Sequence, residues 1–179
     1  QGRPNMNTVP GIDVNTGSLG QGISAACGMA KGAKFLGKDD IRVYTLLGDG
    51  EIEEGQVWEA AMFAGNHGLD NLCVIVDHNG LQIDGAIEEV NSAMPLADKF
   101  RAFKFHVIEL ADGNDMDQIA DAFAQARAVK DKPVAIIAET VKGKGVSYME
   151  NQVGWHGKAP NDEQYEQAMA ELVAAGEEL

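Results

Sequence analysis

The chain has 179 residues, about the length of one domain of ordinary size, and 45% of them are hydrophobic, which suffices for a single buried core. Its formal net charge of -14 and its pI near 4.5 argue against nucleic-acid or anionic-membrane partners, which require a basic surface. A phosphorylated ligand is not excluded, because local backbone amides and a metal ion can outweigh a distant negative surface.

Several features of the sequence predict a cytoplasmic protein. Cys27 and Cys73 lie in apolar stretches and are predicted to be buried thiols in a reducing compartment. No apolar run approaches the ~20 residues of a membrane span, and the first residues lack the charged and apolar regions of a signal peptide.

Apolar periodicity predicts alternating helices and strands. The stretch 72–77, LCVIVD, is apolar up to its last residue, which is typical of a parallel strand buried on both faces. The stretch 53–68 instead places Val57, Ala61 and Ala64 on one face of a helix. This alternation predicts one α/β domain over residues 1–179, a three-layer parallel sheet flanked by helices. The predicted elements are helix 19–36, strand 41–47, helix 53–68, strand 72–77, helix 95–102, strand 105–110, helix 115–129, strand 133–140 and helix 162–174.

Polar residues follow two of the predicted strands. Asp49 lies in the Gly-Asp-Gly that follows the strand ending at Leu47, and Asn79 follows the strand ending at Asp77. Ligands of open parallel sheets bind outside the carboxyl ends of the strands, so Asp49 and Asn79 reach one crevice if these strands are neighbours. A carboxylate and an amide oxygen suit Mg²⁺, with a backbone carbonyl after Asn79 as a third ligand. Gly50, which has no Cβ, lets the backbone approach a phosphate.

Five segments resemble one known family. They are PGIDVNTGSLGQGIS, LLGDGEIEEGQVWEAAMFAG, VIVDHNGLQIDG, TVKGKGVSYMEN and GWHGKAPND, and the spacing from Gly-Asp-Gly to Asn is the signature of thiamine-diphosphate enzymes. Together they resemble transketolase, specifically the N-terminal, diphosphate-binding subunit of the split, two-gene bacterial form, over essentially all 179 residues. The resemblance implies the thiamine-diphosphate-binding fold, with thiamine diphosphate and Mg²⁺ as cofactors.

The resemblance assigns metal and diphosphate roles to four residues. Asp49 and Asn79 are expected to bind Mg²⁺ through their side chains, and Leu81 through its carbonyl oxygen. Gly50 and Asn79 are also expected to lie near the diphosphate.

Two other motifs are expected to contact the rest of the ligands. Gly17, Ser18 and Leu19 match the family's Gly-x-Leu, which lies along the aminopyrimidine. A glycine-rich start to a closely packed helix is the other interpretation of this stretch. His156, in WHGKAP, matches the histidine that touches both the diphosphate side of the cofactor and the sugar substrate.

Several glutamates follow Asp49. Glu54 and Glu59 match carboxylates at the interface between protomers, where they resemble part of a proton-sharing link between two active sites. Glu51 and Glu53 have no assigned role and are expected to be solvated.

Other polar and aromatic residues keep open interpretations. Lys142 and Lys144 are either solvated charges in a loop or part of the wall over the diphosphate. His78 is expected to be structural, although it neighbours Asn79. Trp58 is expected in the core or in a subunit interface.

The sequence departs from the family pattern in two respects. The polar opening, QGRPNMNTVPG, predicts that roughly the first hundred residues of the family subunit are missing, and the family's Gly-His-Pro reads Gly2-Arg3-Pro4. The family's cofactor-activating glutamate also belongs to a pyrimidine-binding domain that this sequence does not supply. The chain is therefore expected to be inactive alone and to require a C-terminal transketolase subunit, with homo-association as a further expectation.

The complete enzyme is expected to transfer a two-carbon ketol unit from a ketose phosphate to an aldose phosphate, in the pentose phosphate pathway. One alternative is another thiamine-diphosphate enzyme, such as a deoxyxylulose-phosphate synthase or a dihydroxyacetone synthase. The other is a non-catalytic fragment or scaffold that binds a partner subunit without turnover.

Overall fold

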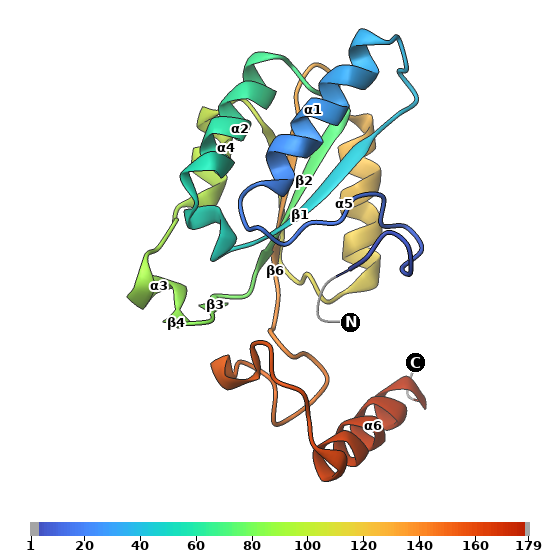
Figure 1. Ribbon diagram of the computed structural model, residues 1–179, viewed down its shortest axis with the longest axis vertical. Coiled ribbons are helices and arrows are strands. Elements are labelled where there is room, and N and C mark those ends of the chain that lie inside the picture. Colours follow the sequence, from blue (N-terminus) through green and yellow to red (C-terminus); the bar gives the residue numbers. More distant parts are fainter. Residues whose placement is uncertain (1–3, 178–179) are drawn as a thin grey trace.

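A four-stranded parallel sheet forms the centre of the molecule (Figure 1). The structure is a computed structural model and describes residues 4–177. Its strands follow the order β1, β2, β6, β5, and every neighbouring pair is parallel. This arrangement confirms the predicted α/β fold. The strands are β1 (Val43–Gly48), β2 (Leu72–His78), β6 (Val134–Glu139) and β5 (His106–Leu110).

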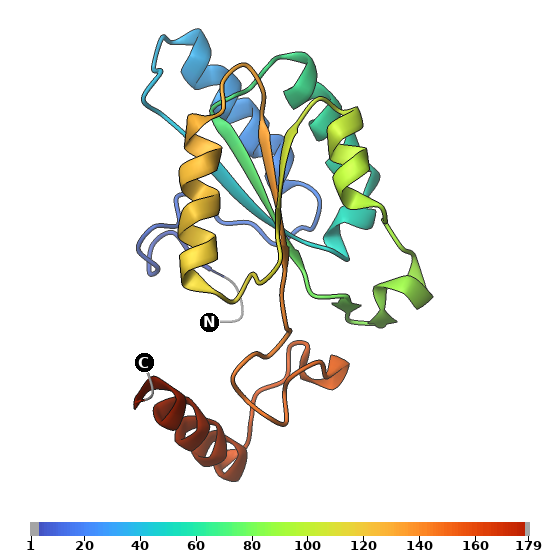
Figure 2. The same ribbon diagram turned by 180° about the vertical axis from the view of Figure 1, so that it is seen from behind.

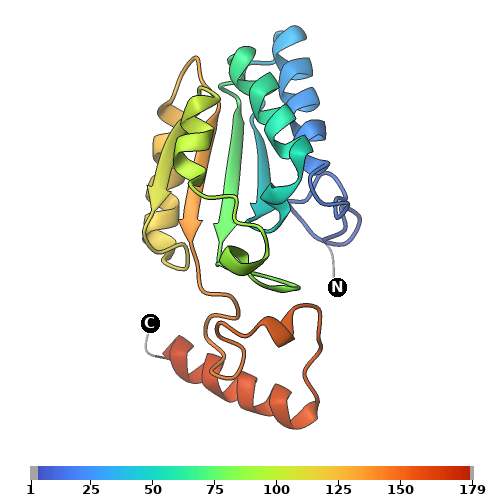
Figure 3. The ribbon, with the colours of Figure 1, turned by 90° about the vertical axis from the view of Figure 1, so that its left-hand side faces the viewer.

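Helices lie on both faces of the sheet. The helices α1 (Gly22–Phe35), α2 (Gly55–Asn66) and α4 (Leu96–Ala102) cover one face. The helix α5 (Met116–Ala128) covers the other face and stands to the left of the strands in Figure 2. Figure 3 looks onto the helices α1, α2 and α4, with the sheet behind them and α5 behind the sheet. No helix within residues 4–177 combines the length and the apolar character needed to cross a membrane.

Side chains of the central strands alternate between two hydrophobic clusters. Val74 and Val76 of β2 belong to the cluster on the side of α1, α2 and α4, which includes Phe100. Cys73, which directly precedes Val74, belongs to the cluster on the α5 side, with Ala126. Successive side chains of a strand point to opposite faces, so burial on both faces explains why β2 is continuously apolar.

Both cysteines are buried free thiols, as predicted. Burial raises the pKa of Cys27 to about 11 and that of Cys73 to about 12. Since the thiolate is the reactive form of cysteine, both side chains serve as small apolar core residues.

Short elements connect the long ones, and the sequence predicts none of them. After β2 come a hairpin of β3 (Leu81–Gln82) with β4 (Gly85–Ala86) and one helical turn, α3 (Ile87–Val90). One 3-10 turn, η1 (Glu51–Glu53), follows β1. A second, η2 (Val153–Trp155), precedes the last helix. Elements of two to four residues are too short to show an apolar period.

Two predicted helices begin later than expected. The helix predicted from residue 19 begins at Gly22, because Gly17 and Gly20 have φ angles of +146° and +80° that a helix excludes. The helix predicted from residue 53 begins at Gly55, since η1 occupies the preceding residues. The last helix, α6 (Asp162–Glu177), lies beyond the carboxyl ends of the strands (Figure 3).

A glycine in α2 allows close packing against the residues that follow α4. A Cβ added at Gly65 would lie 1.8 Å from the carbonyl oxygen of Phe103. In contrast, a Cβ added at Gly32 of α1 would have no atom within 4 Å.

We expect Gly65→Ala to lower the free energy of unfolding by about 1–3 kcal/mol, because the clash with a backbone oxygen outweighs the better helix propensity of alanine. Gly32→Ala is the matched control and should raise stability by about 0.5–1 kcal/mol. Urea denaturation followed by circular dichroism measures both values. Equal stability of the Gly65→Ala variant and the unmodified protein would contradict the close approach.

Candidate functional site

The carboxyl ends of β1 and β2 lie side by side and define one edge of the sheet. Gly48 pairs with Asp77 in the strand register. The backbone N–H of Asp49 donates to the carbonyl oxygen of Asp77 at 3.2 Å. The two strands are therefore neighbours, as one shared crevice for Asp49 and Asn79 requires.

Asp49 is a buried carboxylate, with an exposed fraction of 3%. Its Oδ1 accepts a hydrogen bond from the N–H of Gly50 at 2.9 Å, and its Oδ2 accepts one from the N–H of Gly80 at 2.6 Å. Burial raises the pKa of this carboxyl, and the two backbone hydrogen bonds and the nearby His78 offset part of the shift. Within residues 4–177, Asp49 takes part in no ion pair.

The donor set around Asp49 fits a hard divalent cation. An ionised carboxylate at this depth is costly unless a cation is close to it. Residues 4–177 contain no group of three or more His, Cys, Asp or Glu side chains placed to hold a metal. A metal at this edge therefore needs amide and carbonyl oxygens beside Asp49, which are ligands that Mg²⁺ accepts.

The side-chain amide of Asn79 is held in one orientation. Its Nδ2 donates to Oδ1 of Asp77 at 3.2 Å, and its Oδ1 accepts the N–H of Leu81 at 3.1 Å. Oδ1 of Asp77 also accepts a short hydrogen bond from the hydroxyl of Thr140, which follows β6. Because an amide oxygen has two lone pairs, Asn79 keeps one for a further contact.

Packing within the protein explains why residue 50 is a glycine. A Cβ added at Gly50 would lie 2.8 Å from Oε1 and 2.9 Å from Cβ of Gln82, so the β3 hairpin occupies the space next to it. The predicted approach of a phosphate to Gly50 stays a prediction.

Glu51 and Glu53, which the sequence left without an assigned role and predicted to be solvated, are only partly exposed and both accept hydrogen bonds. Oε1 of Glu51 accepts the N–H of Gly20 at 2.9 Å, and its Oε2 accepts the N–H of Gly48 at 3.1 Å. Oε1 of Glu53 accepts a hydrogen bond from Nε2 of Gln82 at 3.2 Å. Both carboxylates are half-buried and hold chain segments in place. Sequence reasoning missed the contacts with Gly20 and Gln82, because these donors lie about thirty positions away in the sequence.

Glu51 brings the predicted aminopyrimidine loop to the same edge. Gly17, Ser18 and Leu19 directly precede Gly20, whose N–H is bound to Glu51. The side chain of Leu19 is exposed. The structure therefore places this loop beside the end of β1, whereas its contact with a cofactor stays a prediction.

The remaining predicted residues make no polar contact with Asp49 in the described part of the chain. Glu54 precedes α2, Glu59 lies on α2, and both are exposed. His156 is exposed in the loop after η2. Within residues 4–177, no hydrogen bond or ion pair joins any of these side chains to Asp49. Arg3 lies outside the described residues.

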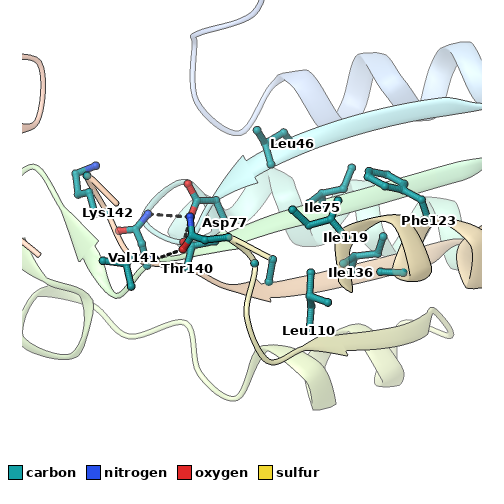
Figure 4. A pocket seen from close by; sticks show the side chains of 16 residues that line it. Leu46, Ile75, Asp77, Leu110, Ile119, Phe123, Ile136, Thr140, Val141 and Lys142 are labelled. Atoms are coloured by element: carbon teal, nitrogen blue, oxygen red, sulfur yellow. Dashed lines mark hydrogen bonds between the residues drawn. The ribbon is translucent and has the colours of Figure 1, made fainter. Parts of the chain in front are cut away.

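A cavity of about 490 Å³ opens near this edge, on the α5 side of the sheet (Figure 4). Asp77, Asn79, Thr140 and Lys142 line its polar part. Its volume lies within the ~300–1,000 Å³ of small-molecule sites. Sequence periodicity cannot reveal such a cavity, because it depends on how α5 packs. Its apolar part includes Leu46, Ile75, Leu110, Ile119, Phe123 and Ile136.

Two side chains outside the predicted site also lie at this edge. Nδ1 of His78 lies 2.7 Å from Oε1 of Glu139, and this contact joins the ends of β2 and β6. Lys142 lines the cavity, whereas Lys144 lies 4.0 Å from Glu150. Lys142 is therefore the better placed of the two lysines to contact an anionic ligand.

We expect Thr140→Val to lower the free energy of unfolding by about 1.5 kcal/mol or more, because it removes a hydrogen bond to the carboxylate of Asp77. Thr140→Ser keeps the hydroxyl and should retain most of the stability. Chemical denaturation measures both variants, and side-chain amide NMR signals report whether Asn79 loses its fixed orientation. If the valine variant matched the serine variant in both measurements, the hydrogen bond would have no structural role.

Known proteins resemble the chain along its whole length. The family model described as "Transketolase, thiamine diphosphate binding domain" matches residues 1–175. The 6-deoxy-6-sulfo-D-fructose transketolase subunit SqwG of Clostridium sp. (strain MSTE9) is 46% identical over 171 residues, which cover 96% of this chain and 62% of that protein. A subunit of the apulose-4-phosphate transketolase of Phocaeicola vulgatus is 46% identical over 178 residues, which cover 99% of this chain and 62% of that protein.

A solved structure shows the same fold. The transketolase from Campylobacter jejuni is similar with a TM-score of 0.82 and 35% identity, over 90% of this chain and 26% of that chain. The chain spans 62% of the length of the two subunit relatives. On these matches, the chain belongs to the transketolase family and corresponds to its thiamine-diphosphate-binding domain.

Proposed function

We propose that this chain is the diphosphate-binding part of a transketolase that works with a pyrimidine-binding partner subunit in the cytoplasm. The complete enzyme would transfer a two-carbon ketol unit from a ketose phosphate to an aldose phosphate. One observation carries the proposal: Asp49 is a buried carboxylate without an ion pair in the described part of the chain, beside Asn79, at the carboxyl edge of a parallel sheet.

The residues of this edge would hold Mg²⁺ and the diphosphate. Asp49 and Asn79 would ligate the metal through side-chain oxygens and Leu81 through its carbonyl. Gly50 and Asn79 would lie near the diphosphate, whose negative charge the metal neutralises. The orientation of the Asn79 amide by Asp77 supports this role, because fixed ligands lose less entropy on binding.

Other residues would bind the remaining parts of the ligands. Gly17, Ser18 and Leu19 would lie along the aminopyrimidine, and His156 would bind the sugar and orient it. Thiamine diphosphate, when bound, supplies the electron sink for carbanion chemistry. The glutamate that activates it would come from the partner subunit.

Association between copies of this chain is part of the proposal. Glu54 and Glu59 are exposed, so a second copy of the chain can contact them. In the proposed dimer, these carboxylates would share a proton across the interface between the two copies. The side chain of Trp58 packs against Phe100 and Phe103 of this chain, so that aromatic cluster supports α2 from within.

The sugar is the least determined part of the reaction. The names of the two subunit relatives state different sugars, 6-deoxy-6-sulfo-D-fructose and apulose 4-phosphate. We propose a ketose with an anionic terminal group as donor. A panel of ketose phosphates and sulfonated ketoses, assayed with the assembled enzyme, tests this choice and separates transketolase from deoxyxylulose-phosphate synthase activity.

We expect Asp49→Ala to weaken binding of thiamine diphosphate with Mg²⁺ by about a hundredfold or more, because it removes the charged metal ligand. Titration calorimetry measures this on the chain mixed with a C-terminal transketolase subunit from the same organism. Asp121→Ala, which removes an exposed aspartate of α5, is the control and should bind as the unmodified chain does.

Two outcomes would contradict the proposal in different ways. Unchanged cofactor binding by the Asp49→Ala variant would show that the metal ligands are elsewhere. An unmodified mixture that forms a complex but binds no cofactor would indicate a non-catalytic scaffold. Chelation of Mg²⁺ with EDTA should abolish binding, and added Mg²⁺ should restore it.

We expect His156→Ala to lower kcat/KM for the donor sugar by about tenfold or more, since a lost hydrogen bond to a charged group costs about 1.5–3 kcal/mol. The affinity for thiamine diphosphate should change less. Steady-state kinetics and calorimetry on the same assembled sample separate the two effects. An unchanged kcat/KM would remove His156 from the substrate site.

A further inference from the structure

The loop between β6 and α6 carries His156 and lies beyond the carboxyl ends of the strands (Figures 1 and 3). Hydrogen bonds within the loop close it on itself. The N–H of Asn151 donates to the carbonyl oxygen of Lys142 at 2.9 Å, and the N–H of Gly145 donates to Oε1 of Glu150 at 3.0 Å. The loop is therefore folded, although most of it lies outside regular helices and strands.

His156 has a fixed main chain and an exposed side chain. Its backbone N–H donates to the carbonyl oxygen of Val153 at 2.9 Å, which fixes the main chain at the end of η2. Within residues 4–177, the imidazole itself makes no hydrogen bond and no ion pair. Immobilising a side chain costs binding free energy when a ligand arrives. Packing beside His156 therefore matters for any contact that it makes with a sugar.

Trp155, the residue before His156, contacts two other side chains of the loop. Its ring lies 5.1 Å from the ring of Tyr148, measured between centroids, at an interplanar angle of 53°. Nζ of Lys158 lies 4.7 Å from the centroid of the Trp155 ring, within the range of a cation–π contact. The second contact brings Lys158 back over Trp155, so His156 lies in the turn between them.

The part of the loop that holds Trp155 is fixed to α6 by two successive residues. The hydroxyl of Tyr148 donates to the carbonyl oxygen of Gln164 at 2.5 Å. The N–H and the hydroxyl of Ser147 donate to the two carboxylate oxygens of Glu171, at 2.7 Å each. The ring that packs on Trp155 is therefore held in place by the last helix.

The face of α6 that meets the loop is the shielded face of this helix. Within residues 162–176, Ala168 is buried and Gln164 and Glu171 are half-buried, whereas the other side chains are exposed. Residues separated by four and seven positions lie on one face of a helix, so these three residues share the face that contacts the loop. Within this chain, α6 therefore acts as a brace for the loop that carries His156.

We propose that Trp155 is a positioning residue, which keeps the His156 imidazole in one orientation, and that α6 supports Trp155 through Tyr148. This inference rests on the proposed function, in which His156 contacts the sugar. A side chain that is already ordered loses less conformational freedom when it binds. The effect of Trp155 on turnover passes through His156, and Trp155 itself does not touch the sugar.

A double-mutant cycle on the assembled enzyme tests this route. We expect Trp155→Ala to lower kcat/KM for the donor sugar by about fivefold to tenfold, because it removes an aromatic pair and a cation–π contact. In a chain that already carries His156→Ala, the same substitution should lower kcat/KM by less than about twofold, since no imidazole remains to be positioned. Trp155→Phe keeps an aromatic ring next to Tyr148 and should restore most of the activity.

NMR relaxation of the isolated chain measures the order of His156 without any ligand. Its imidazole C–H groups should be rigid on the picosecond-to-nanosecond timescale in the unmodified chain and mobile in the Trp155→Ala variant. Trp155→Phe should keep them rigid. Phe35→Ala is the matched control, because it removes an exposed aromatic ring at the end of α1 and should leave His156 unchanged. Circular dichroism checks that α6 persists in every variant.

Tyr148→Phe is a milder second variant, for the case that Trp155→Ala unfolds α6. It keeps both aromatic rings and removes only the hydrogen bond to Gln164. It should lower kcat/KM by about threefold when His156 is present, as loss of one neutral hydrogen bond does. An equal loss in the His156→Ala background would contradict a route through the imidazole.

The outcomes separate this inference from the proposed function. If Trp155→Ala leaves kcat/KM and the relaxation of His156 unchanged while His156→Ala lowers kcat/KM, the positioning role is wrong and the proposed function stands. If Trp155→Ala lowers kcat/KM by the same factor with and without His156, Trp155 acts directly and the inference is overturned. If His156→Ala leaves kcat/KM unchanged, His156 lies outside the substrate site, and both the inference and that part of the proposed function fail.

Discussion

The edge of the sheet is organised around one buried charge, the carboxylate of Asp49. Two backbone N–H groups, from Gly50 and Gly80, hold its oxygens, and burial raises its pKa nevertheless. Gly80 reaches it from the segment after β2, so the carboxylate ties together the ends of two strands. Solvation that water would otherwise provide has to come from groups placed around this carboxylate, such as these two N–H donors. The turns of this edge are arranged around that requirement.

Much of the fold could be predicted, because the apolar residues of long helices and strands recur at the spacing typical of each element. The apolar run of β2 and the one-sided pattern of α2 each predicted the correct element, since every side chain of such a segment has its burial set by the face on which it lies. The predicted start of a helix was wrong where a glycine with positive φ, such as Gly20, precedes the helix. The hairpin of β3 and β4 was not predicted, because strands of two residues are too short to show an alternation of apolar and polar side chains.

The candidate site was likewise predictable in part. Asp49 and Asn79 could be placed together, because carboxyl ends of neighbouring parallel strands meet by geometry. Glu51 was misjudged, since its hydrogen-bond donor Gly20 is 31 positions away in the sequence. The cavity lined by Lys142 and the contact of α6 with the loop before it depend on packing between elements, which no local pattern encodes.

The double hydrogen bond of Glu51 has a consequence for the entropy of ligand binding. Its carboxylate holds the N–H of Gly20 and the N–H of Gly48 at once, so the loop before α1 and the end of β1 behave as one body. A loop that is already ordered loses less conformational freedom when a ligand arrives. The two hydrogen bonds of Glu51 would therefore favour tight binding of a ligand at this edge by ordering the loop beforehand.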